Sequence, residues 1–156
     1  MTVDLAATFA PPTVPLRDWL RENFSATVGT DANGTEMVYA AGGLPDAAFT
    51  DAGVLRGTAV TLYTAGGLDG GVAHDRPFAR FNVWDPSAST AEAAAYALRA
   101  LLDHALPGTA LGLAASPSSV RLRGADTAPP LWAPDPDTGT PRFVVTATLT
   151  LQAVSA

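Results

Sequence analysis

The segment 143–153 alternates apolar and polar side chains along almost its whole length. Val145, Ala147, Leu149 and Leu151 fall on one side, and the other side is rich in threonine. A period of two is typical of a β-strand that has one face in a hydrophobic core. A strand this long also needs partners along its length, because unpaired backbone groups are costly. The segment therefore predicts that a β-sheet is the rigid centre of the fold.

Other parts of the chain supply partners for this strand. Alternation predicts strands over 58–64, 77–85 and 119–124, and a shorter extended piece around 36–41. Apolar residues at helical spacing predict helices over 15–26 and about 90–106, the second one ended by Pro107 and Gly108. We therefore expect an α+β fold: a single mixed, mostly antiparallel β-sheet with two main helices packed on one face.

Between these elements the sequence predicts an N-terminal arm and two long loops within one domain, 1–156. The arm, 1–14, contains proline and has little periodicity, and the core spans 15–153. Four glycines in six positions predict a flexible loop over 66–76. Prolines and turn residues predict a second long loop over 107–142. Loops on a rigid scaffold are frequent contact sites, so we expect both to carry function.

Composition excludes several classes of chemistry. The chain has no cysteine, which excludes disulfides, thiolate metal sites and cysteine nucleophiles. All nine basic residues are arginine, so no lysine can form a Schiff base or reach a phosphate from a P-loop. The net charge of −6 and scattered arginines do not predict a surface that grips nucleic acid. No stretch is long and apolar enough for a membrane span.

Few residues suggest catalysis or metal binding. His74 and His104 are the only histidines, and neither belongs to a metal-binding motif. The segment Asp135–Gly139 resembles the start of a calcium loop, but it lacks the glutamate of a complete one, so a simple turn is the favoured interpretation. We therefore predict no catalytic residue, no metal site, no cofactor and no enzymatic activity.

Arginine and large aromatic residues suggest contacts between proteins instead. Arg76 and Arg142 each lie at the mouth of a predicted loop, where solvation is the alternative role. Arg80 and Trp84 share the strand face opposite the core, so Trp84 lies either under a second layer or against a partner. With loop residues added, the candidate interface set is Gly67, Asp69, Gly70, Arg76, Arg80, Trp84, Trp132, Asp135, Asp137 and Arg142.

The order of these features resembles the tail terminator, or tail completion, proteins of long-tailed double-stranded DNA bacteriophages. Three stretches carry the resemblance: VTLYTAGGLDGG, RFNVWDPSASTAEAAAYALRALLDHAL and PDPDTGTPRFVVTATLTLQA. Together they span most of the chain from residue 58 onward.

The resemblance implies a structural protein of the virion, placed at the head-proximal end of the tail and assembled in the host cytoplasm. It implies a homo-oligomeric ring, a hexamer, that caps the tail tube, stops its polymerisation and joins the tail to the head connector. Its partners would be the tube protein and a head-completion protein, without a membrane. DNA would pass through the acidic lumen without specific binding. The alternatives are another neck component, such as a head-closure or tube protein, or a small α/β ligand-binding domain or enzyme.

Overall fold

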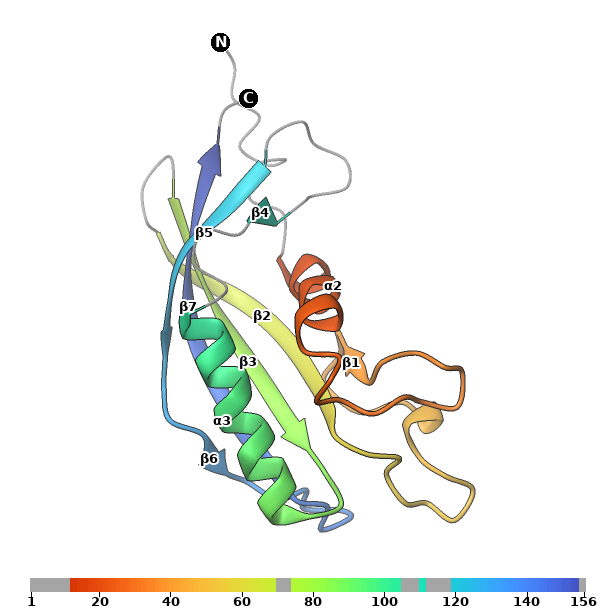
Figure 1. Cartoon of the computed structure of the whole chain (residues 1–156). Helices are drawn as coiled ribbons and strands as arrows, with labels where there is room; N and C mark the ends of the chain where they lie inside the picture. The colour runs from red at the N-terminus through yellow and green to blue at the C-terminus, as the bar shows by residue number, and fades with distance from the viewer. Residues whose placement is uncertain (1–11, 70–73, 105–109, 112–118, 155–156) are drawn as a thin grey trace.

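The computed structural model shows an α+β fold in which two helices lie on one face of a single β-sheet (Figure 1). The structure describes residues 12–69, 74–104, 110–111 and 119–154. The helices are α2 (Thr13–Asn23) and α3 (Ala88–His104), close to their predicted positions. The predicted class and arrangement are therefore confirmed.

Three long strands form the centre of the sheet: β2 (Ala59–Asp69), β3 (His74–Trp84) and β7 (Arg142–Val154). β3 pairs antiparallel with both β2 and β7. On the far side of β7 lie β5 (Ser119–Thr127) and β4 (Ala110–Leu111), while β6 (Leu131–Trp132) also pairs with β7. At the opposite edge, β1 (Val38–Tyr39) is parallel to β2, which makes the sheet mixed.

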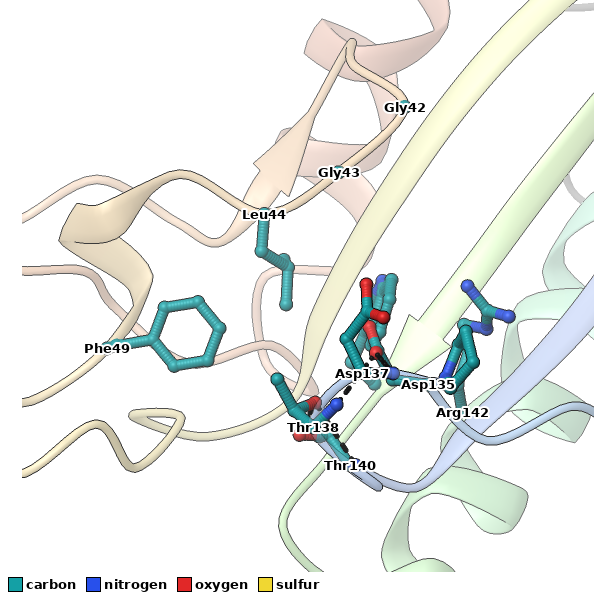
Figure 2. Close-up of a pocket in the computed structure, with 11 residues that line it drawn as sticks. Gly42, Gly43, Leu44, Phe49, Asp135, Asp137, Thr138, Thr140 and Arg142 are labelled. Carbon is teal, nitrogen blue, oxygen red and sulfur yellow. Dashed lines mark hydrogen bonds between the residues drawn. The ribbon is translucent and has the colours of Figure 1, made fainter.

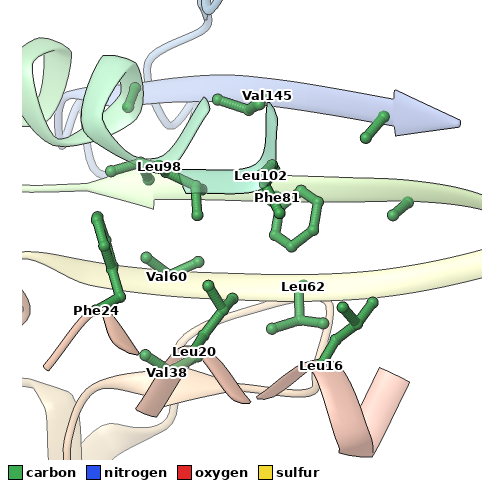
Figure 3. Close-up of a cluster of buried hydrophobic side chains, with 14 of the residues drawn as sticks. Leu16, Leu20, Phe24, Val38, Val60, Leu62, Phe81, Leu98, Leu102 and Val145 are labelled. Carbon is green, nitrogen blue, oxygen red and sulfur yellow. The ribbon is translucent and has the colours of Figure 1, made fainter. Parts of the chain in front are cut away.

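The main core lies between the helices and what we call the helix face of the sheet (Figure 3). α2 supplies Leu16 and Leu20, α3 supplies Leu98 and Leu102, and all four side chains are fully buried. The alanines of α3, including Ala91 and Ala95, are buried as well and let this helix approach the strands closely. From the sheet come buried residues of β2, β3 and β7: Val60, Leu62, Ala79, Phe81, Val83, Val145, Ala147, Leu149 and Leu151.

A buried carboxylate ties the start of β2 to the start of α3. Asp85 follows β3 and accepts a hydrogen bond from the Thr58 hydroxyl at 2.7 Å. Its other oxygen accepts the Ser87 N–H at 2.8 Å, just before α3 begins. Because a buried carboxylate needs such partners, this arrangement fixes the angle at which α3 leaves the sheet.

The predicted glycine loop over 66–76 is wrong for most of its length. β2 continues to Asp69 and β3 begins at His74, with a register shift between Ala65 and Leu68. Strand pairing uses backbone groups, so glycines are tolerated at such an irregularity. Residues 70–73, including Gly70, lie outside the described residues.

The second predicted loop, 107–142, is also wrong as a continuous loop. It contains β4, β5 and β6, and β5 runs to Thr127 instead of ending at 124. β5 pairs with β7 from Ser119 to Thr127, again with a register shift near Gly124. A weak sequence pattern is sufficient here because β7 offers a continuous edge for backbone hydrogen bonding.

On the opposite side of the sheet, which we call the second face, the described residues form a cover at one end only. There Trp84 packs with Met37, Ala48 and Leu55 in a second, smaller core. The covering residues belong to the segment 37–57, which includes β1 and the 3-10 helix Asp46–Ala48. Along the same strands, away from this end, aromatic and arginine side chains of the second face are exposed or half-buried.

Candidate interaction surface on the second face

Strand register places the predicted interface residues in ordered rows across the second face. Trp84 lies opposite Arg142, and Arg80 lies between Tyr63 and Thr146. Farther along, Phe78 lies beside Thr148, which in turn lies opposite Asp126. The residues thus fall into two groups, one under the covering segment and one on the part of the sheet that we call the open part, defined by Tyr63, Phe78, Arg80, Thr146 and Thr148.

The first group gathers around Trp84, whose side chain is only 4% exposed. The Arg142 guanidinium lies over its indole ring, 4.9 Å from the ring centroid. Arg142 Nε also donates to the Ala133 carbonyl at 2.7 Å, which holds the guanidinium in place. Of the two roles considered for Trp84, the structure shows burial under a second layer of its own chain.

A hollow of about 300 Å³ opens beside this group (Figure 2). Leu44 and Phe49 line it from the covering segment, Asp137 and Thr138 line it from the connection before β7, and Arg142 lines it from the first position of β7. Two of the predicted acidic residues, Asp135 and Asp137, therefore meet Trp84 and Arg142 at one end of the molecule.

The acidic segment beside the hollow is a turn, as favoured from the sequence. The Asp135 carboxylate accepts the backbone N–H groups of Asp137 at 2.8 Å and Thr138 at 3.1 Å. The Gly139 N–H donates to the Asp135 carbonyl, and Gly139 has φ of 70°, which suits glycine. Burial raises the pKa of Asp135, but these N–H groups and nearby Arg142 outweigh it and keep the pKa below its ordinary value. The carboxylate thus stays charged and stabilises the turn.

A polar row connects Trp84 to the open part of the second face. The buried Thr61 hydroxyl oxygen accepts hydrogen bonds from the Trp84 indole at 3.3 Å and the Asn82 amide at 3.1 Å. Arg80 Nε donates to the amide oxygen of the same Asn82 at 3.3 Å. Because Thr61 and Asn82 are both buried, this row holds Arg80 at a fixed place on the sheet.

The open part presents aromatic side chains to solvent. Phe78 is 41% exposed and Tyr63 is 37% exposed. Neither residue belongs to the interface set predicted from the sequence. The sequence alternation nevertheless indicates their position, because both residues alternate with core residues and share the face of Arg80. Their exposure on a rigid central strand pair makes this part of the sheet the best candidate for contact with another protein.

The remaining predicted residues lie outside the open part, and Trp132 lies on the helix face of the sheet, because its strand partner Phe143 packs against the main core. Arg76 lies in β3, with its guanidinium 3.9 Å from the exposed Asp126 carboxylate. Gly67 and Asp69 belong to the far end of β2, and Gly70 lies outside the described residues. Trp132 is half-exposed and stacks at a tilt on Phe143, 5.1 Å between ring centroids.

Neither helix in the described ranges combines the length and apolar character needed to cross a membrane. Among the described residues, no group of three or more His, Asp or Glu side chains is placed to hold a metal ion. His104 ends α3, and of His74 only the strand backbone is described.

No protein-family model matches the chain. No curated protein matches it in sequence either.

Proposed function

We propose that this chain is a structural protein of a bacteriophage virion, a tail terminator that forms a ring on the tail tube. The ring would stop tube polymerisation and join the tail to the head connector, with no catalytic step. The proposal starts from the resemblance of the stretches after residue 58 to that family. Its structural support is the second face, where a stiff sheet carries exposed aromatic residues beside arginine.

The observation that carries the proposal is the exposure of Tyr63 and Phe78 on the neighbouring strands β2 and β3. Apolar side chains on a regular sheet are usually covered, and both helices of the described ranges lie on the other face. In a ring, a neighbouring copy would cover them, and Arg80 would meet carboxylates of that copy. A chain with net charge −6 offers many such carboxylates.

The hollow end of the molecule would make a different contact. Asp137 and the glycines at 42 and 43 lie on surface segments, and a Cβ added to either glycine would meet no atom within 4 Å. This end is therefore free to fit the tube or the connector without disturbing the sheet. A protein that binds its own copies and also the tube or the connector needs two separate surfaces.

The decisive experiment is the mass of the purified chain in solution, by light scattering and native mass spectrometry, with electron microscopy of any oligomer. The proposal expects a closed ring with a central hole. In the variant Tyr63→Asp the ring should fall to monomers, because a buried unpaired carboxylate is costly at an interface.

The matched control is Tyr96→Asp, which changes the same residue type at a 50% exposed position on α3. This variant should leave the ring intact. A monomeric wild type at micromolar concentration, or equal loss of the ring in both variants, would contradict the proposal. Tails of normal length in phage particles that lack the protein would contradict its terminator role specifically.

A further inference from the structure

A second hollow, of about 320 Å³, lies between α2 and the residues that follow β1. Arg17 and Arg21 line it from α2, and Tyr39 lines it from β1, with the segment 40–45 completing the wall. The two arginines are four residues apart on a helix, so their side chains project from the same side. Gly43 and Leu44 separate this hollow from the one beside Asp137.

The Nε atom of Arg21 has no hydrogen-bonding partner among the described residues. This atom is buried, and no acceptor within the described ranges lies in hydrogen-bonding position to it. The ion pairs seen among the described residues also do not include Arg21. A buried N–H of a charged group without an acceptor is destabilising, so this position favours an oxygen ligand that the chain does not supply.

Asp31, whose carboxylate is influenced by the charge of Arg21, already has hydrogen-bonding partners of its own. Its Oδ1 accepts the N–H groups of Asn33 at 2.8 Å and Thr35 at 3.1 Å, and its Oδ2 accepts the Tyr39 hydroxyl at 2.9 Å. Burial raises the pKa of Asp31, but these bonds and the charge of Arg21 outweigh it and leave the pKa below its ordinary value. The ionised Asp31 thus attracts Arg21 through space without accepting from its Nε.

Tyr39 stays a neutral donor to Asp31. Burial, followed by the hydrogen bond and charge of Asp31, raises the pKa of Tyr39 well above its ordinary value. Arg17, in contrast to Arg21, has a partner: its guanidinium lies 2.9 Å from the carboxylate of the exposed Asp18. An exposed pair of adjacent residues like this is weak and can exchange for a better anion.

We propose that this hollow is an anion site that takes a carboxylate, held by Arg21 with support from Arg17. A planar guanidinium binds the two oxygens of a carboxylate in parallel, which a single water cannot reproduce. The ring of Tyr39 and the side chains of Leu44 and Pro45 offer an apolar wall for the carbon part of the ligand. The carboxylate could come from a small organic acid or from an acidic side chain of a second copy. The inference does not depend on the ring proposed above.

The test is a titration of the ¹⁵N-labelled full chain with sodium acetate, followed by NMR, with sodium chloride at equal ionic strength as reference. We expect a saturable shift of the Arg21 Nε–H signal and of the Gly43 backbone amide with acetate only. In Arg21→Gln the Gly43 response should be lost, and in Arg17→Gln the affinity should fall about tenfold. Arg21→Lys should keep part of the response.

Arg56→Gln is the matched control, since Arg56 is exposed and does not line the hollow. It should titrate like the wild type. If a second copy supplies the carboxylate, dilution of the protein alone should move the same signals, and acetate should compete. The site would be overturned if the signals shifted equally with chloride and acetate and did not change on dilution. An unchanged Gly43 response in a folded Arg21→Gln protein would overturn it as well.

Discussion

The two ends of the second face are built from the same strands but have opposite roles. At the covered end, Trp84 is buried by Met37, Ala48 and Leu55 and behaves as a core residue. On the open part, Phe78 and Tyr63 occupy equivalent positions of the same alternation and remain exposed. Strand alternation therefore assigns a residue to a face, whereas the covering segment decides whether that residue stabilises the monomer or is free for a partner.

The largest expected effect comes from removing the centre of the covered end. Trp84→Ala should lower the free energy of unfolding by about 3–5 kcal/mol, because it opens a cavity and removes the indole that Thr61 and Arg142 contact. Trp132→Ala is the matched change at a half-exposed indole and should cost about 1–2 kcal/mol. Urea unfolding of both variants gives the comparison. Equal losses would show that the covering segment does not form a core around Trp84.

A smaller loss of stability is expected when the turn that precedes β1 and the covering segment loses its hydrogen bonds to Asp31. Asp31→Asn removes the charge that organises the turn before β1 and should cost about 1–3 kcal/mol at neutral pH. The folded pKa of Asp31 lies below its ordinary value, so its ionised form stabilises the fold above pH ~4. This contribution is lost as the pH falls through the folded pKa.

Urea midpoints measured between neutral pH and pH 3 check this prediction. The wild type should lose more stability on acidification than Asp31→Asn does, and Asp135 should add to the loss because its pKa is lowered in the same direction. If the urea midpoints of the two proteins fall equally between neutral pH and pH 3, the ionised Asp31 does not stabilise the covered end.

The smallest expected effect on the monomer comes from the open part. Phe78→Thr should change the free energy of unfolding by less than about 0.5 kcal/mol, since threonine favours strands and the side chain is exposed. The same variant should weaken self-association, measured by light scattering over a dilution series. A large loss of monomer stability would show that Phe78 is part of a core, and the distinction between the two ends would fail.

The central strands and both helices were predictable because their residues follow one period over many positions. β7 and α3 are found within a few residues of the predicted ranges. The last residues of β5 and the far ends of β2 and β3 were missed, since Gly66, Gly67 and Gly124 disrupt the pattern while backbone pairing continues. Local composition cannot show that β7 lies alongside to receive those hydrogen bonds.

The candidate site was predictable only in parts. The turn at Asp135 and the shared face of Arg80 and Trp84 follow from local sequence. The burial of Trp84 does not, because the segment 37–57 has little periodicity and its position over the sheet is set by tertiary packing. The hollow around Arg21 combines α2 with residues after β1, which are far apart in the sequence.

The position of β7 also bears on how the chain is made. β7 lies between β3 and β5, yet it follows every other strand in the sequence. During translation, neither neighbour can complete its pairing until residues 142–154 have left the ribosome. A nascent chain halted before that point would present two open strand edges, which are prone to pair with other chains. Folding should therefore be completed late in synthesis, and premature termination products should be aggregation-prone and short-lived.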